Sequence, residues 1–284
     1  MTTKANDSFF LRHEFLIRRL HSLSGLVPVG AYMVIHLLTN STVLNGARSF
    51  QRAVDSIHSL GVLLPAVEWT FIFLPLIFHA VVGVAIIRSG TSNTSSYPYG
   101  GNVRYMLQRA TAWIALAFIF FHVLQLHGWV KPIAHQLGQG KFSHLHATSS
   151  AADAIQSSFW IIVAYTIGIL ACVYHLANGL WTSGITWGLW TTPAAQSRAN
   201  WLCGGFGLVL AAVGMSALFG ISTVDVKSAY EVEEKINANK VADGELSAEE
   251  LEAHKPHLKA LEPAGATAPD EAQAAGETVS PDKS

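Results

Sequence analysis

Four histidines lie inside four separate apolar stretches of the chain, at His36, His79, His122 and His175. Ionisable side chains are costly inside a lipid bilayer, so a histidine at such a position indicates a functional site by default. A single one also has an ordinary explanation as a hydrogen-bonding group, but four, one per stretch, are harder to explain in this way. Neutral imidazole is a frequent ligand of iron. Two haems, each held by two histidines, would use all four side chains.

Five apolar segments are long enough to carry these histidines across a bilayer, which takes about 20 residues of helix. We place the spans near residues 19–39, 66–88, 106–128, 157–182 and 201–221. The chain is 50% hydrophobic and 13% charged, with a mean hydropathy of +0.33, which is not the composition of a soluble domain. The predicted fold class is therefore an all-α membrane protein with five transmembrane helices, the first four of which form an up-down bundle.

The direction of successive spans predicts how the histidines pair. Spans alternate in direction, so His36 and His122 lie about 5 residues from one surface, whereas His79 and His175 lie about 14 residues from it, and at 1.5 Å per residue the two levels differ by roughly 14 Å. Cofactor sites in such bundles are built from facing helices. We therefore predict one haem b between His36 and His122 and a second between His79 and His175. The separation is too large for one metal centre shared by all four.

Basic residues in the short connections predict the orientation. One side of the membrane would hold eight of them, at Lys4, Arg12, Arg18, Arg19, Arg88, Arg104, Arg109 and Arg198. The opposite side would hold four, at Arg48, Arg52, Lys131 and Lys141. Because cytoplasmic segments carry the excess, we expect a multi-pass protein of the cell (inner, cytoplasmic) membrane. Its N-terminus would be cytoplasmic and its C-terminal tail outside.

The charge balance changes near residue 222 and predicts two domains. Residues 1–224 hold 12 basic and 5 acidic residues, whereas residues 225–284 hold 6 and 14. We expect a di-haem transmembrane domain over 1–222 and, over 223–284, an acidic tail that lacks an apolar core, is disordered and is dispensable for haem insertion. The outer connections, about 40–65 and 129–156, contain SFQRAVDSIHSL and SSAADAIQSS, which would form short interfacial helices.

Several sequence strings carry a family resemblance. They are RRLHSLSGLVPVG (18–30), IHLLTN (35–40), VEWTFIFLPLIFHAVVG (67–83), MLQRATA (106–112), FHVLQ (121–125) and YHLANGLWTSGITWG (174–188). Over roughly residues 8–221 the chain resembles the cytochrome b subunit of succinate:quinone oxidoreductases, of the single-subunit, five-helix, two-haem type found in succinate dehydrogenases and fumarate reductases. The resemblance implies that His79 and His175 bind the iron of a proximal, higher-potential haem. His36 and His122 would bind that of a distal, lower-potential haem.

The resemblance also implies partners. These are a flavoprotein subunit, an iron-sulfur subunit on the cytoplasmic face, membrane lipid, and a membrane quinone, with menaquinone expected. No nucleic acid is expected. The chain has no GxGxxG or cysteine-rich motif for a flavin or cluster of its own. It would act as the subunit that does not bind the dicarboxylate and would pass electrons between the iron-sulfur subunit and quinone.

Two groups of residues are weaker site candidates. A quinone needs groups that exchange protons, and Glu68 at the outer entrance of span two is the first candidate, with Asp55 and His58 as substitutes. A carboxylate near a helix N-terminus is also favourable in its own right. On the inner side, Arg19, His21 and Arg109 would neutralise haem propionates, since buried carboxylates need partners. The basic residues among them also fit the inside excess of positive charge.

Two other functions compete with this interpretation. One is a di-haem cytochrome b that anchors a hydrogenase or formate dehydrogenase, with similar helices and histidines. The strings HAVVG, NGLW and TWG favour the succinate:quinone family instead. The other is a haem-free transporter whose histidines bind metal ions or relay protons, but such a protein would want carboxylates within its spans, and almost none lie there.

Overall fold

The computed structural model describes residues 12–90, 94–127, 142–256, 258 and 261. Within these residues all regular structure is helical, as the sequence predicted. The described part contains five helical segments long and apolar enough to cross a membrane, at Glu14–Asn45, Gly61–Arg88, Gly100–His127, Phe159–Thr186 and Pro193–Thr223. Each contains or overlaps one predicted span. The chain is an all-α, multi-pass membrane protein.

The first three segments are composite, while the last two are single α-helices. The first joins α2 (Glu14–Ser24), the π-helix η1 (Gly25–Gly30), α3 (Ala31–Ser41) and the 3₁₀ turn η2 (Thr42–Asn45). The second joins η3 (Gly61–Leu63), α5 (Leu64–Glu68), the π-helix η4 (Trp69–Phe73) and α6 (Leu74–Arg88). The third joins α7 (Gly100–His122) to the π-helix η5 (Val123–His127), and the last two are α10 (Phe159–Thr186) and α11 (Pro193–Thr223).

Two of the π-helical turns coincide with prolines. Pro28 lies inside η1, and Pro75 follows shortly after η4. Proline has no backbone N–H, so the carbonyl one turn earlier loses its α-helical partner and the helix widens locally. η1, η4 and η5 each lie within two turns of one of the four intramembrane histidines. Such bulges reorient the side chains that follow, and they are common at functional sites.

Close helix packing holds the bundle together, and its outer surface is apolar. α10 packs against α7 and α11, α11 packs against α3, and α2 packs against α6. A Cβ at Gly207 would lie 2.9 Å from that of Ala177, so a glycine is needed for the approach of α11 to α10. Phe120, Leu202 and Leu208 are more than 70% exposed, as expected of side chains that face lipid.

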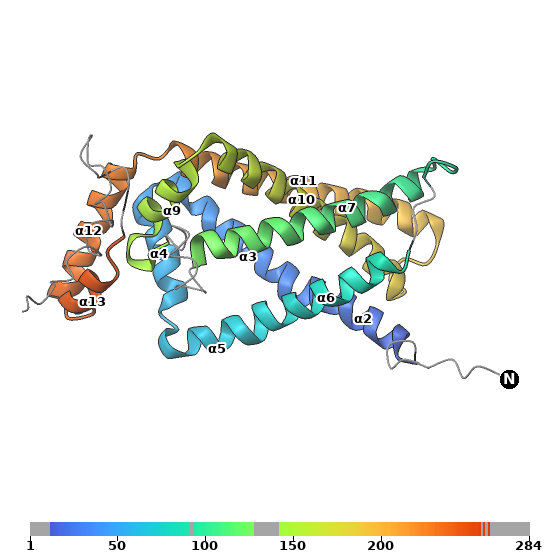
Figure 1. Cartoon of the computed structure of the whole chain (residues 1–284), viewed down its shortest axis with the longest axis horizontal. Helices are drawn as coiled ribbons and strands as arrows, with labels where there is room; N and C mark the ends of the chain where they lie inside the picture. The colour runs from blue at the N-terminus through green and yellow to red at the C-terminus, as the bar shows by residue number, and fades with distance from the viewer. Residues whose placement is uncertain (1–11, 91–93, 128–141, 257, 259–260, 262–284) are drawn as a thin grey trace, which may run out of the picture.

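Four shorter helices gather at one end of the bundle, on the left of Figure 1, while α2 lies at the other end. They are α4 (Ala47–His58), α9 (Ala147–Gln156), α12 (Val226–Ala242) and α13 (Ala248–Ala253), and we call them the cap. α4 and α9 confirm that the two outer connections contain short helices, but α9 is buried at every position from Ala147 to Ile155 and so is packed inside the cap. Phe50, Ile155, Leu218 and Val226 belong to one apolar core that joins the cap to α11.

The disorder predicted for the acidic tail is wrong for residues 226–253, which form α12 and α13. α12 packs against α4 and α9 and buries Glu233 and Asn237 completely. The reason is that α12 docks through buried polar side chains. Composition cannot reveal this, because a buried polar side chain stabilises a contact only where it finds a hydrogen-bond partner. Residues 262–284 lie outside the described part of the chain.

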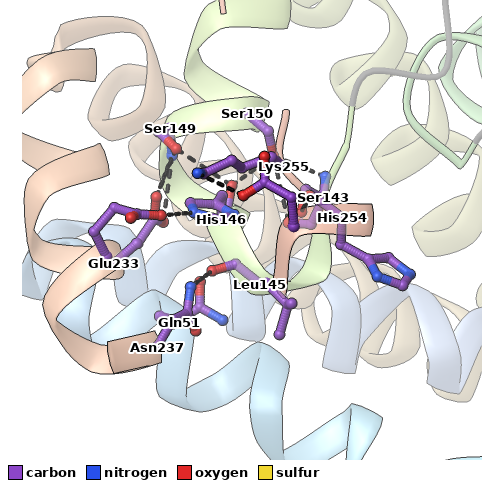
Figure 2. A network of polar contacts seen from close by, with 12 residues as sticks. Gln51, Ser143, Leu145, His146, Ser149, Ser150, Glu233, Asn237, His254 and Lys255 are labelled. Atoms are coloured by element: carbon purple, nitrogen blue, oxygen red, sulfur yellow. Dashed lines mark hydrogen bonds and ion pairs between the residues drawn. The ribbon is translucent and has the colours of Figure 1, made fainter. Parts of the chain in front are cut away.

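Glu233 supplies the acceptors that the N-terminus of α9 lacks. The first amides of a helix have no partner within it. The Glu233 carboxylate accepts hydrogen bonds from the backbone N–H of Thr148 (2.6 Å), from that of Ser149 (3.3 Å) and from the Ser149 hydroxyl (2.6 Å), as Figure 2 shows for Ser149. Gln51 of α4 accepts from the N–H of Ala147 (2.9 Å). Burial raises the pKa of the Glu233 carboxyl, and the hydrogen bonds from Ser149 and Thr148 oppose that shift.

Candidate functional site

The structure brings together the two histidine pairs predicted from depth. The ring centres of His36 (α3) and His122 (the last residue of α7) lie 5.7 Å apart, with an interplanar angle of 79°. The ring centres of His79 (α6) and His175 (α10) lie 6.1 Å apart, at 85°. Each pair therefore joins two helices that are not consecutive in the sequence.

The separation within each pair fits one metal ion between two imidazoles. An imidazole nitrogen binds a metal at about 2 Å, so two imidazoles on one metal have ring centres roughly 6 Å apart. Among the described residues, no group of three or more histidine, cysteine, aspartate or glutamate side chains is arranged to hold a metal. A bis-histidine haem needs two imidazoles on one iron, and each of the two pairs supplies that set.

Backbone carbonyls orient the two histidines of the pair farther from the cap. His79 Nδ1 lies 2.9 Å from the carbonyl oxygen of His21, and His175 Nδ1 lies 3.2 Å from that of Gln108. A carbonyl only accepts, so each Nδ1 must carry the hydrogen. Each Nε2 then keeps a lone pair for a metal.

At the pair nearer the cap, tyrosine hydroxyls lie next to Nδ1 in place of backbone carbonyls. His122 Nδ1 lies 3.1 Å from the hydroxyl of Tyr165 in α10, and His36 Nδ1 lies 3.5 Å from that of Tyr32, one turn earlier in the same helical segment. All four imidazoles therefore have a partner at Nδ1. The two pairs differ in the chemistry of that partner.

Glycine allows close approach at the pair farther from the cap. A Cβ on Gly25 would lie 2.3 Å from Cε1 of His79, so only glycine lets η1 lie against this ring. The His21 ring stacks on His79 with centres 4.0 Å apart and an interplanar angle of 11°. The bulged segment η1 and the end of α2 thus form one wall of this site.

Two of the three propionate candidates, Arg19 and His21, carry buried nitrogen atoms without a hydrogen-bond partner, and the His21 ring stacks on His79. His21 Nδ1 and Arg19 Nε are buried and have no hydrogen-bond partner. The Arg19 guanidinium lies 4.5 Å from the ring centre of Phe15 and 4.9 Å from that of Trp187. Buried polar atoms are normally hydrogen-bonded, so these two nitrogen atoms are consistent with an anionic group that would bind here.

The third propionate candidate, Arg109, has other partners. It donates to the carbonyl of Gly90 (2.9 Å) and to that of Ile87, and its guanidinium also contacts the Tyr105 hydroxyl. These carbonyls lie at the end of α6, where a cationic side chain is favourable. The structure therefore separates Arg109 in role from Arg19 and His21.

Glu68 lies on the cap side, within the second span. It is the last residue of α5 and lies inside the continuous helical segment Gly61–Arg88. It is therefore not in the first turn of the span, where the sequence placed it. Its carboxylate is 3.8 Å from His127 Nε2 and interacts electrostatically with Tyr32, the partner of His36. The carboxylate is therefore near the His36–His122 pair.

The two substitutes for Glu68 belong to the cap. Asp55 accepts from Lys240 of α12 (2.7 Å) and from Gln51 (2.9 Å). The His58 ring stacks on His144, with ring centres 4.7 Å apart. Both side chains thus contribute to the contacts that hold the tail and the outer connections together.

Sequence reasoning missed the polar side chains that surround the histidines. Asn178 accepts from Arg104 and donates to the Gln108 side chain (2.6 Å), which in turn donates to the carbonyl of His175 (3.2 Å). Tyr165 and Gln125 form a similar chain next to His122. The available signal was their position, because polar residues inside apolar spans are rarely incidental.

Comparison with known proteins identifies the family. No family model matches the chain. The succinate dehydrogenase cytochrome b558 subunit of Bacillus subtilis (strain 168) is 37% identical over 206 residues, which cover 72% of this chain and 96% of the relative. This match supports the succinate dehydrogenase interpretation over the hydrogenase anchor and the transporter. The chain belongs to the family of succinate dehydrogenase cytochrome b subunits, the haem-containing membrane subunits of an oxidoreductase complex.

Proposed function

We propose that this subunit carries electrons between an iron-sulfur subunit and a membrane quinone through two b haems, one at each histidine pair. His79 and His175 would hold the proximal haem, and His36 and His122 the distal one. The observation that supports this most is that both pairs have the spacing for one iron and a partner at every Nδ1. When bound, haem b supplies a one-electron iron couple, and two imidazole ligands leave no open position for oxygen chemistry.

The protein's own residues would orient the ligands and balance charge. Hydrogen bonds to the carbonyls of His21 and Gln108 hold the rings of His79 and His175 and raise their basicity. Arg19 and His21 would bind the propionates through the buried nitrogen atoms that lack partners. Arg109 would bind a propionate only if it released its hydrogen bonds to the carbonyls at the end of α6.

The quinone, with menaquinone suggested by the family resemblance, would react on the cap side, near the distal pair. Glu68 would deliver and remove protons at the quinone oxygens. Its carboxylate interacts with Tyr32 and lies 3.8 Å from His127, so a second titratable group is at hand.

The membrane orientation and the partners complete the proposal. The N-terminus would be cytoplasmic and the cap outside. The iron-sulfur subunit, which connects to a flavoprotein, would then dock at the end of the bundle opposite the cap. The N-terminal segment and the connections between spans at this end carry eight Lys and Arg residues, against four in the connections at the other end, and this end lies nearer to His79 and His175. Succinate or fumarate would react on the flavoprotein and not on this chain.

The test is to remove the ligands one at a time from the assembled complex. His36→Leu and His122→Leu should each lose the same haem, and His79→Leu and His175→Leu should each lose the other. Dithionite-reduced minus oxidised spectra identify the haem, and a pyridine haemochrome assay should fall from two haems per chain to one. If His36→Leu and His79→Leu lost spectroscopically identical haems, the pairing would be wrong.

A further inference from the structure

A chain of buried side chains runs from His122 to the cap. His122 Nδ1 lies 3.1 Å from the Tyr165 hydroxyl, which donates to Gln125 Oε1 (2.9 Å). Gln125 Nε2 donates to the carbonyl of Ala154 in the last turn of α9 (3.2 Å). Tyr165 is 4% exposed and Gln125 is 2% exposed, so water does not compete for these bonds.

The direction of each hydrogen bond in this chain follows from its anchored end. The Ala154 carbonyl can only accept, so it selects the NH₂ group of Gln125 and turns the amide oxygen toward Tyr165. That oxygen also only accepts, so the Tyr165 hydroxyl must donate to it. The phenolic oxygen is then left to accept the Nδ1 hydrogen of His122, and His122 Nε2 keeps its lone pair.

Aromatic packing prevents Tyr165 from leaving this position. Its ring centre lies 5.2 Å from that of Phe118 and 6.2 Å from that of Phe121. Phe118 fits against α10 only because residue 168 is glycine, where a Cβ would lie 2.1 Å from the Phe118 ring. The hydroxyl is thus held by packing as well as by Gln125.

We propose that Tyr165, held by Gln125, is a positioning residue that fixes the tautomer of His122 and sets the reduction potential of the haem on the cap side. The proposal rests on the proposed function, in which His122 is an axial ligand. An acceptor at Nδ1 makes an imidazole a more basic ligand, which favours oxidised iron and lowers the potential. Donation from Tyr165 to Gln125 polarises the hydroxyl and strengthens it as an acceptor.

The other three histidines lack such an adjustable chain. His79 and His175 bond to backbone carbonyls, which no side-chain substitution removes. The hydroxyl of Tyr32 is 3.5 Å from His36, at the limit of a hydrogen bond. His122 is therefore the ligand whose electronic properties a single hydroxyl controls.

The experiment is a redox titration of the assembled complex, followed through the visible bands of both haems. Tyr165→Phe removes only the hydroxyl, so it should raise the midpoint potential of the cap-side haem and leave the other haem unchanged. Gln125→Leu should shift the same haem in the same direction by a smaller amount. Thr166→Val is the matched control, because it removes a neighbouring hydroxyl that bonds to Ile162 of its own helix (2.9 Å). It should shift neither potential.

An unchanged cap-side potential in Tyr165→Phe with full haem content would overturn the proposal. If Tyr165→Phe fails to retain this haem, Gln125→Leu decides. An upward shift then supports the proposal, whereas an unchanged potential or loss of the haem shows only a structural role and overturns it. His122→Leu separates this failure from that of the proposed function, since a cap-side haem that survives this substitution would refute the ligand assignment itself.

Discussion

At the residue scale, the four imidazoles share a task but differ in their surroundings. Carbonyl partners at His79 and His175 neither titrate nor rotate, so those rings have a fixed tautomer. At His122 and His36 the partners are tyrosine hydroxyls, which can both donate and accept. The hydrogen bonding of the pair nearer the cap therefore depends on further side chains. The Glu68 carboxylate is one of them, because it interacts with Tyr32, the partner of His36.

Replacement of Glu68 tests its role at the same scale. Glu68→Gln keeps the size and polarity of the side chain but cannot ionise, so proton delivery to the quinone should slow. We expect quinone-linked turnover to fall on the order of 100-fold, the usual contribution of a positioned acid or base. Turnover of succinate with an artificial dye, measured in the same preparation, should persist along with both haems.

The matched control is Glu14→Gln, which removes a carboxylate that pairs with Arg18 in α2, distant from the cap (Figure 1). It should leave both activities intact. Unchanged quinone turnover in Glu68→Gln would reduce this residue to a structural acid beside His127. Asp55 and His58 would then become the candidates to test, although both side chains already make contacts within the cap.

At the scale of elements, the spans and the histidine pairs could be predicted because their signals are local. A bilayer demands long apolar helices, and alternating direction then determines which histidines share a depth. α4 was predictable for a similar reason, since its sequence has a polar and an apolar side, whereas α9 is buried from Ala147 to Ile155. The π-helical turns at Pro28 and before Pro75 were not predicted, because the neighbouring helices decide how a freed carbonyl is accommodated.

Contacts between distant elements could not be predicted. Tyr165 and Gln125 are in contact only because α10 lies against the end of α7. The sequence of neither segment indicates how the two helices are aligned along one another. α12 was taken for disordered sequence because its buried face is polar. Glu233 stabilises the fold through the amides of α9, which lie 84 residues away in sequence. The amino-acid composition shows that residue 233 is acidic, but not that its carboxylate binds the N-terminal amides of α9.

Histidine contacts between cap elements predict a pH-dependent loss of docking. Burial, together with His58 and His254, lowers the pKa of His144 from 6.5 to about 4; Asp55 opposes this shift and Lys240 adds to it. Protonation is then easier in the undocked state, so His144 favours docking above pH 6.5, and this contribution is lost as the pH falls toward about 4. Amide hydrogen exchange of α12 between pH 7 and pH 4.5 should show falling protection.

His144→Phe separates this effect from other titrations. Phenylalanine keeps a ring that can stack on His58 but takes no proton, so the loss of protection at low pH should be smaller in this variant. Glu233 acts in the opposite sense, because its raised pKa makes protonation easier in the docked state, and it is the same in both proteins. An identical pH profile for both would assign the effect to other groups.

At the scale of the whole molecule, the tail is linked to the cap-side pair through α9. Glu233 and Gln51 satisfy the first amides of α9, and the Ala154 carbonyl near its other end anchors Gln125, two hydrogen bonds from His122. α9 also packs against η5 and α11. Whatever loosens the N-terminal end of α9 should therefore act on the ligand chain of the cap-side haem.

This link reverses the expectation that the tail is dispensable. Truncation after Ser222 removes Glu233 and Asn237 and so leaves the amides of Thr148 and Ser149 and the Leu145 carbonyl without these partners. Each unsatisfied buried group costs about 1–3 kcal/mol. The truncated chain should unfold at a lower temperature and lose its cap-side haem before the other on heating. Glu233→Ala should reproduce part of this effect, whereas Glu231→Ala, at an exposed position of the same helix, should not. Equal retention of both haems by the full-length and truncated proteins would show that α9 holds without α12.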